Sequence, residues 1–349
     1  MKVKIPLVDE AAQKLARQRW DHLTKPLGSL GRLEELGIRI AGMTGEPILK
    51  IKRKVIFTVA ADHGVTAEGI SAYPQAVTAQ MVINFLKGGA AINVLARHAG
   101  AEVLVVDAGV AAAIPKMDGL ILAKVRLGTA NMAKEPAMDR AQAKAVLETG
   151  IRIFEENHRF QPIDLVGLGD MGIGNTTASS ALTAVLTGTP VAKVTGRGTG
   201  LTDEMLLKKI QVIEKALSLH RPDPKDPMDC LTKVGGLEIG CLAGITLAAA
   251  QARVPVVLDG FITSAAALLA YRLVPSVKDY LIASHRSVEP GHRAILKTLG
   301  LEPLLDLKMR LGEGTGAALC FLLIEASAKL LSEMATFGEA GVSERQVVG

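Results

Sequence analysis

The chain has 349 residues, with 40 Lys and Arg against 35 Asp and Glu and 49% hydrophobic residues, enough for one large or two ordinary globular domains. This composition excludes an intrinsically disordered chain and a collagen-like repeat. Aromatic residues make up only 3%, and basic residues are interspersed with acidic ones, so no nucleic-acid partner is expected despite the net charge of +5.

The mean hydropathy of +0.29 raises the question of a membrane span. The richest apolar stretches, 241–252 and 317–324, fall short of the roughly 18–20 residues that a spanning helix needs. The opening segment MKVKIPLVDEAAQ has neither the apolar core nor the cleavage site of a secretory signal. We therefore expect a cytoplasmic protein with no membrane partner, and its three cysteines show no zinc-binding spacing.

Helical periodicity opens the chain, over 9–20 and 30–43, with no strand between. From residue 54 onward, short runs rich in β-branched residues end in Gly or Asp, and Ala- and Leu-rich stretches follow them. This alternation predicts βαβ units and a parallel sheet. The predicted strand runs are 54–64, 102–109, 163–172, 254–261 and 279–285.

Covering helices are predicted over 77–100, 177–186 and 263–273. The small residues of 243–252 would let a further helix approach the sheet closely. The chain ends as it begins, because 316–333 has helical periodicity without an accompanying strand. The two ends could therefore pack together as a small helical unit.

The richest cluster of glycines, 167–177 (GLGDMGIGNTT), directly follows a predicted strand. It matches GxGxxG over 167–172, but 187–193 holds no acid for a ribose hydroxyl, which counts against a nicotinamide dinucleotide. One frame over, 169–176 resembles a P-loop with Asn175 in place of the lysine. Neither motif is complete, but backbone N–H groups at a helix N-terminus still predict an anion site for a phosphate.

Two further glycine clusters follow, 195–200 (TGRGTG) and 312–316 (GEGTG). In the second, Glu313 stands between glycines at the start of an apolar helix, where a ligand can come close. This carboxylate could act as a general base or could simply complement the helix dipole. Lys209, in a helix predicted over 203–217, could reach a phosphate or lie in solvent.

Three histidines, His63, His285 and His292, follow predicted strands. None has HxH or HxxxH spacing with another, so no metal is expected, and no GxSxG elbow anchors a hydrolase triad. The usual acidic pair that binds metal-complexed phosphoribosyl diphosphate is also missing. Spacing alone leaves open whether Asp62, His63 or Asp259 contacts a ligand.

Nearly the whole chain resembles the nicotinate-nucleotide:dimethylbenzimidazole phosphoribosyltransferase family. The resemblance rests on nine segments in one order, too many for a chance match. They are 23–34 (LTKPLGSLGRLE), 60–65 (AADHGV), 71–81 (SAYPQAVTAQM), 167–177, 196–201 (GRGTGL), 235–239 (GGLEI), 258–266 (LDGFITSAA), 284–292 (SHRSVEPGH) and 311–317 (LGEGTGA).

This resemblance implies an α/β fold with a Rossmann-like parallel six-stranded sheet flanked by helices. A large domain, 44–310, would carry the sheet, and 1–43 with 311–349 would form a small helical domain. It also implies a homodimer that transfers phosphoribose from nicotinate mononucleotide to 5,6-dimethylbenzimidazole. The products would be α-ribazole 5′-phosphate, formed with inversion at the anomeric carbon, and nicotinate. No metal or other cofactor is expected.

The resemblance places Glu313 on the family's catalytic glutamate, and we assign Asp170 as a second acid. Gln80 and Met81 are assigned to the acceptor base. The remaining assignments are to phosphate and ribose: Gly172, Ile173, Gly174, Asn175, Lys209, Gly312, Gly314 and Thr315.

Asp170 departs from the family pattern, which usually has GEMGIGNTT where this chain has GDMGIGNTT. The missing methylene draws the carboxylate back by about 1.5 Å. The acceptor could therefore be another benzimidazole, adenine or a phenol. Two further hypotheses are a NAD-dependent oxidoreductase, which lacks its ribose acid here, and a noncatalytic partner subunit, against which the intact Glu313 argues.

Overall fold

The computed structural model describes residues 3–198 and 200–343. Within them, a six-stranded sheet with parallel neighbours has the strand order β3-β2-β1-β4-β5-β6. The predicted α/β fold with a parallel six-stranded sheet is confirmed. The strands are β1 Lys54–Ala61, β2 Glu102–Gly109, β3 Leu120–Leu122, β4 Leu165–Met171, β5 Val256–Leu258 and β6 Leu281–Ala283.

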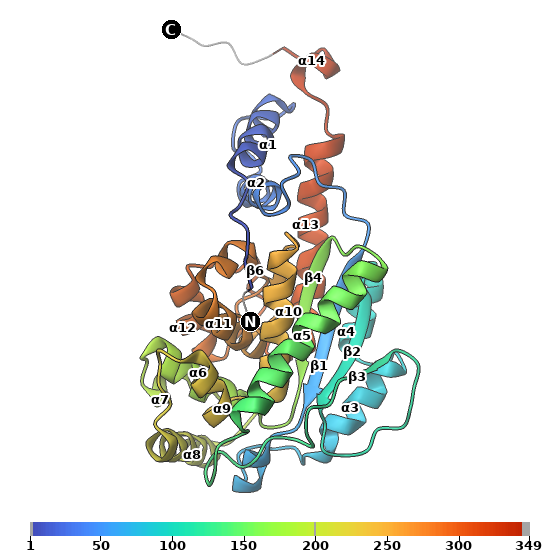
Figure 1. The fold of residues 1–349 in the computed structure, drawn as a ribbon. Helices are drawn as coiled ribbons and strands as arrows, with labels where there is room; N and C mark the ends of the chain where they lie inside the picture. The colour runs from blue at the N-terminus through green and yellow to red at the C-terminus, as the bar shows by residue number, and fades with distance from the viewer. Residues whose placement is uncertain (1–2, 199, 344–349) are drawn as a thin grey trace.

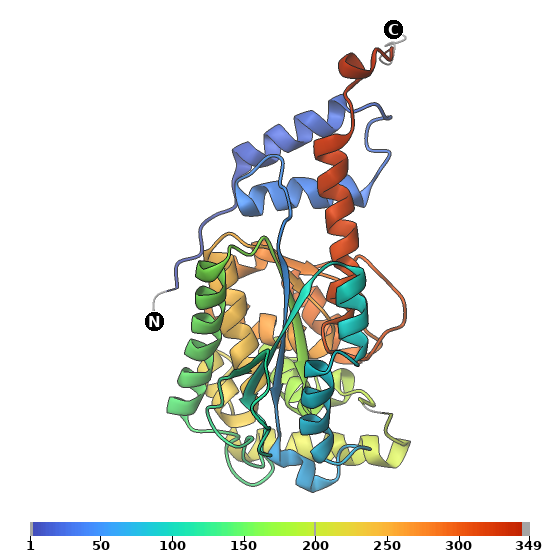
Figure 2. The ribbon, with the colours of Figure 1, turned by 90° about the vertical axis from the view of Figure 1, so that its right-hand side faces the viewer.

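Helices cover both faces of the sheet (Figures 1 and 2). On one face α10 packs against the strands and α5 packs against the outer side of α10. Helices α3, α4 and α13 lie on the other face. The helices and 3-10 turns are α1 Glu10–His22, α2 Arg32–Thr44, η1 Gly64–Glu68, α3 Ala76–Leu86, α4 Ala91–His98, α5 Arg140–Phe160, α6 Asn175–Thr187, α7 Val191–Val194, α8 Asp203–His220, α9 Pro227–Val234, α10 Leu237–Gln251, α11 Phe261–Leu273, η2 Pro275–Tyr280, α12 Pro290–Leu299, α13 Thr315–Glu333 and α14 Phe337–Ala340.

The strand order reverses direction at the centre of the sheet, between β1 and β4. The chain leaves β1 toward β2 on one side and leaves β4 toward β5 on the other. Connections that diverge in this way leave a crevice beyond the carboxyl ends of the two strands, where ligands of such sheets bind. All eight residues of β1 are buried, as expected for a central strand.

The single helix predicted over 77–100 is wrong, because the structure has two helices there, α3 and α4. Gly88 takes a φ of +75° between them, a conformation that ends a helix. Helix α5 was not predicted, although its capping box is visible in the sequence: Asp139 accepts from the N–H of Gln142, whose side chain returns to Asp139.

The first and last long helices of the chain meet at one end of the molecule, where α13 runs from the sheet to α1 and α2 (Figure 2). A second hydrophobic core lies there, centred on Trp20 with Leu23, Ala41 and Leu331. The first turns of α13 pack against the sheet instead, so this helix contacts both parts. The division into 44–310 and the two terminal segments stays a prediction, and residues 1–2 and 344–349 of those segments lie outside the described residues.

Two stretches are long and apolar enough to span a membrane by length and composition alone, Ala76–His98 and α13. The first is interrupted at Gly88, where α3 ends before α4 begins. The second packs against the sheet and against α1 and α2. Helix α13 therefore packs as a core helix does, and core helices pass the same test.

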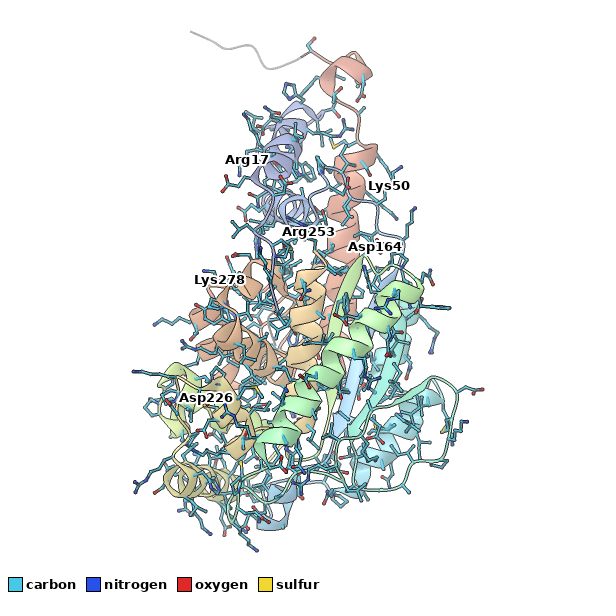
Figure 3. The ribbon with its side chains drawn as sticks, viewed as in Figure 1. Arg17, Lys50, Asp164, Asp226, Arg253 and Lys278 are labelled. Carbon is cyan, nitrogen blue, oxygen red and sulfur yellow. The ribbon has the colours of Figure 1, made fainter. Side chains whose placement is uncertain are left out.

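The two ends of the sheet, where the strands begin and where they end, differ in their contacts. At the end where the strands begin, the Oδ2 atom of Asp164 accepts the backbone N–H groups of Lys52 and Arg53 at 2.7 and 2.9 Å and fixes the entry into β1. Figure 3 shows Asp164 at this end, on the side of α1 and α2, and Asp226 toward the opposite end. The opposite end, where the strands finish, is the end at which ligands of such sheets bind.

The packing of α5 against α10 predicts a sharp stability effect at Gly150, where an added Cβ would overlap the carbonyl oxygen of Cys241. We expect Gly150→Ala to lower the free energy of unfolding by about 1–3 kcal/mol, because overpacking outweighs the higher helix propensity of alanine. Gly338→Ala in α14 is the control, since its Cβ would meet nothing within 4 Å. Urea unfolding measures both, and a Gly150→Ala protein as stable as the wild type would contradict this packing.

Candidate active site

A cavity of about 500 Å³ opens beyond the carboxyl end of β4, beside the point where the strand order reverses. Its walls come from the turn after β4, the loops after β5 and β6, the start of α3, and residues 310–313. This volume lies in the range of small-molecule sites. The cavity is therefore the candidate active site.

The turn between β4 and α6 forms one wall. Gly174 takes a φ of +93° and lets α6 begin at Asn175. The N–H of Ile173 donates to Thr78 Oγ1 at 3.1 Å, and the N–H of Asn175 donates to the carbonyl of Gly172 at 3.0 Å. The predicted anion-binding turn thus faces the cavity, with two of its N–H groups already bonded within the protein.

The first two glycines of the GxGxxG match lie inside β4 and not in a loop. A Cβ on Gly169 would overlap the carbonyl oxygen of Glu313, and one on Gly167 would come within 3.0 Å of the ring of Phe321. These glycines let α13 and the turn before it approach the strand. The segment therefore does not form a dinucleotide-binding loop.

A second turn, formed by Gly312, Glu313 and Gly314, lies against the end of β4. Its φ angles are +90°, +65° and +100° in that order, and the middle value is costly for a residue with a side chain. The Glu313 carbonyl accepts from Thr58 Oγ1 at 2.9 Å, and its N–H donates to the Asp170 carbonyl at 3.2 Å. These bonds hold a strained conformation at the cavity wall.

The Glu313 side chain reaches the first turn of α4, where its Oε2 atom accepts the N–H of Ile92 at 3.3 Å. Burial raises the pKa of this carboxyl, the Ile92 N–H partly offsets that rise, and the negative charge of Asp259 adds to it. A carboxylate with a raised pKa accepts a proton more readily at neutral pH. Glu313 therefore has the environment of a general base.

Asp170, at the end of β4, also lines the cavity. Its Oδ2 atom accepts from the side-chain amide of Asn175 at 2.8 Å, while Oδ1 is buried without a partner among the described residues. Burial raises the pKa of this carboxyl well above its ordinary value, and the charges of Asp259 and Glu238 raise it further. A neutral Asp170 can donate a hydrogen bond to a ligand.

Lys209 lies behind the wall, not in it. Its Nζ atom donates to Thr176 Oγ1 at 2.8 Å and to the Gly196 carbonyl at 3.3 Å, and only 1% of the residue is exposed. Burial lowers the pKa of this amine to about 8, against a smaller opposing effect of Glu289. Its charge thus acts on the cavity from behind Thr176, a lining residue.

Three other predicted binding residues do not line the cavity. The N–H of Gly314 donates to Asp259 Oδ2 at 3.0 Å, and the hydroxyl of Thr315 donates to a carbonyl of its own turn. Gln80 is exposed on α3, whereas Met81, one residue on, does line the cavity. The helix phase at α3 thus brings one predicted base-binding residue to the site and leaves the other outside.

The cavity wall also includes residues to which we assigned no role, among them Ser287, Glu289 and Arg310. Glu289 Oε1 accepts the N–H of Gly198 at 3.0 Å, and Arg310 donates to the Gly198 carbonyl at 3.1 Å. Burial lowers the pKa of His292 to about 3, and its neutral Nδ1 accepts the N–H of Ser287. Ser287 and Glu289 could have been predicted as site residues, because they lie in 284–292, one of the segments that resemble the family.

Asp62 and His63, which follow β1, lie outside the cavity wall and are held by contacts within the protein. His63 is buried, and its Nε2 atom lies 2.8 Å from Glu238 Oε1. Asp62 accepts the N–H of Ala111 at 2.8 Å. Neither residue lines the cavity. In the part of the chain that the structure describes, no three His, Cys, Asp or Glu side chains are grouped to hold a metal.

Comparisons of sequence and of structure with known proteins all point to phosphoribosyltransferases. A family profile described as Phosphoribosyltransferase matches residues 5–342. The chain is 58% identical to a nicotinate-nucleotide–dimethylbenzimidazole phosphoribosyltransferase of Chloroflexus aggregans, covering 98% of this chain and 96% of that one. It is 56% identical to its namesake in Geobacter sulfurreducens, covering 98% and 97%. The crystal structure of CobT from Thermus thermophilus is similar, with a TM-score of 0.92, 48% identity and coverage of 96% and 100%.

The buried amine of Lys209 predicts a pH-dependent stability. Between pH 8 and 10.5 the unfolded chain holds a proton on Lys209 that the folded chain has released, so the folded state gains stability as pH rises through this window. At pH 7 we expect Lys209→Met to unfold with a free energy about 1–3 kcal/mol higher than the wild type, because the buried charge is gone.

Urea unfolding at pH 7 and at pH 10 measures this effect. The advantage of Lys209→Met should shrink at pH 10, where the wild-type amine is neutral. Lys208→Met, an exposed position on the same helix, is the control and should show no such change. A Lys209→Met advantage that is the same at both pH values would contradict the lowered pKa.

Proposed function

The chain belongs to the phosphoribosyltransferase family that matches residues 5–342, and from this we propose that it transfers phosphoribose from nicotinate mononucleotide to 5,6-dimethylbenzimidazole. The products are α-ribazole 5′-phosphate and nicotinate. The observation that carries the proposal is Glu313, a buried carboxylate with a raised pKa on the wall of a cavity large enough for such ligands. The near-full-length identity to relatives named for this reaction supports it.

In the proposed reaction, one ring nitrogen of the benzimidazole attacks the anomeric carbon of the nucleotide. The bond from this carbon to the nicotinate nitrogen breaks, and its electron pair neutralises the pyridinium, so the leaving group needs no acid. Glu313 accepts the proton from the other ring nitrogen as positive charge develops on the heterocycle. Attack from the face opposite the leaving group inverts the anomeric centre.

We assign the phosphate and ribose to the turn at the N-terminus of α6, Gly172 to Asn175, and to Gly312 in the turn before α13. The helix dipole and the amine of Lys209 behind Thr176 favour an anion there. Arg310 also lines the cavity and adds a second positive charge. Gly314 and Thr315 would act only through the shape of their turn, since Asp259 and the turn's own carbonyl hold them.

The acceptor base lies, in this proposal, between Met81 and Asp170. A neutral Asp170 would donate from its unpartnered Oδ1 to the departing nicotinate, since the free lone pair of the benzimidazole is the one that attacks. Because Asp170 is shorter than the glutamate usual in the family, an acceptor other than dimethylbenzimidazole is the second candidate. Adenine, another benzimidazole or a phenol would use the same transfer chemistry.

We also propose that the enzyme is a cytoplasmic homodimer. Exposed apolar side chains beside the cavity support an association, because Tyr73 and Leu311 line it while being 55% and 57% exposed. Exposed apolar surface of this kind occurs where a partner or a ligand binds. Light scattering behind gel filtration gives the mass in solution, and a particle of one chain would contradict the dimer.

Replacing Glu313 with glutamine tests the general base. We expect kcat to fall by about 10²–10⁴-fold with little change in KM for nicotinate mononucleotide, because the amide cannot accept the proton. Chromatography of the products formed from nicotinate mononucleotide and dimethylbenzimidazole gives the rates. Glu325→Gln is the control, in the helix α13 that follows the Glu313 turn, since Glu325 pairs with Lys54 and does not line the cavity. Wild-type turnover in Glu313→Gln would contradict the assigned role.

Replacing Asp170 with glutamate tests the acceptor assignment. The added methylene extends the carboxyl by about 1.5 Å into the cavity, so turnover with dimethylbenzimidazole should be preserved or improved. Steady-state rates with dimethylbenzimidazole, adenine and a phenol, in wild type and variant, show which acceptor each prefers. A large loss with dimethylbenzimidazole would mean that the shorter acid is matched to this cavity and that the preferred acceptor differs.

A further inference from the structure

Asp259 lies at the end of β5, fully buried, and both of its carboxylate oxygens hold the start of α13. Oδ2 accepts the N–H of Gly314 at 3.0 Å, and Oδ1 accepts the N–H of Gly316 at 2.6 Å. These N–H groups belong to the first turn of the helix, where a negative charge is also favoured by the helix dipole. The Asp259 side chain, which follows β5, thus caps α13, the helix that begins at Thr315 just after the Glu313 turn.

We propose that Asp259 is a positioning residue for Glu313: it holds the Gly312–Gly314 turn in its left-handed conformation and so keeps the Glu313 carboxylate at the cavity wall. This inference rests on the proposed function. Asp259 does not itself line the cavity, although its neighbour Gly260 does. It therefore acts through the turn and not by touching a ligand.

The orientation of Asp259 is fixed on its other side by His285, whose Nε2 atom lies 3.5 Å from Oδ1. An added Cβ on Gly316 would overlap the His285 ring, so the helix start, the carboxylate and the imidazole are in tight contact. Two hydrogen bonds, the neighbouring imidazole and close packing hold the carboxylate in this orientation. Such support is what a strained conformation at a functional site requires.

An asparagine at this position would disturb the contact in a defined way. One of the two oxygens would become an NH₂ group that faces a backbone N–H across a distance of 3.0 Å or less. Two donors cannot satisfy each other, so either Gly314 or Gly316 must move. Because Glu313 directly precedes Gly314, its carboxylate would move with the turn.

The charge of Asp259 has a second effect. The groups near Glu313 include Asp170 from β4, Asp259 from β5 with His285 beside it, and the Ile92 N–H from α4, and Arg310 lines the same cavity. The negative charge of Asp259 raises the pKa of Glu313. Removing that charge should lower the pKa of Glu313, so the acid limb of the rate profile moves to lower pH.

The test compares Asp259→Asn with Asp107→Asn. Asp107 is a matched control, because it is fully buried at the end of β2, its Oδ1 accepts the N–H groups of Gly109 and Val110 at 3.1 and 2.8 Å, and it lies outside the cavity wall. For Asp259→Asn we expect kcat with nicotinate mononucleotide and dimethylbenzimidazole to fall by about 10²-fold, with KM for the nucleotide nearly unchanged. Asp107→Asn should keep the wild-type kcat.

The pKa of Glu313 is read independently of activity, by carboxyl-carbon NMR titration of protein labelled at glutamate, with Glu313→Gln to assign the signal. It should fall in Asp259→Asn and stay unchanged in Asp107→Asn. A kcat equal to wild type, or an unmoved Glu313 titration, would overturn the inference. A wild-type protein that forms no α-ribazole phosphate would instead overturn the proposed function, and the titration would still decide the role of Asp259.

Circular dichroism and thermal unfolding check that Asp259→Asn is folded. If it is not, Asp259→Glu replaces it, since this variant keeps the charge and both acceptor oxygens but adds a methylene. It should keep the raised pKa of Glu313 and still lose kcat, because the longer side chain displaces the turn. An Asp259→Glu enzyme with the wild-type kcat would overturn the inference.

Discussion

The site depends on one close backbone contact, between the end of β4 and the turn before α13. A side chain at Gly169 would overlap the Glu313 carbonyl, so only glycine allows the turn to seat there. Once seated, the turn is held by Thr58 and by the carbonyl of Asp170. This contact brings the two acids of the site together, one from the middle of the chain and one from near its end.

Burial and like charge then set the chemistry of these acids. Glu313 and Asp170 are both buried, and Asp259 raises the pKa of each. The two acids differ in their hydrogen-bond partners, since Glu313 accepts a backbone N–H and Asp170 accepts an amide from Asn175. One fold can thus supply a proton acceptor and a hydrogen-bond donor from two carboxyl groups, because their surroundings differ.

The sequence could predict the parallel sheet, because buried β-branched runs alternate with helices in it, and it could point to the turns at Asn175 and Glu313. It could not separate glycines that bind from glycines that pack: Gly167 and Gly169 have the spacing of a loop but lie within a strand. That difference is set by contacts with α13, more than 140 residues away in the chain. For the same reason, spacing could not show that Lys209 stands behind the wall.

The central claim is that the α6 turn holds the phosphate while the turn before α13 presents Glu313 to the acceptor. A crystal structure of the protein with α-ribazole 5′-phosphate tests it most directly. The account predicts the phosphate at the N-terminus of α6, near Gly174, and the benzimidazole ring nitrogen within hydrogen-bond distance of the Glu313 carboxylate. A phosphate bound elsewhere, or a benzimidazole that Glu313 does not reach, would contradict it.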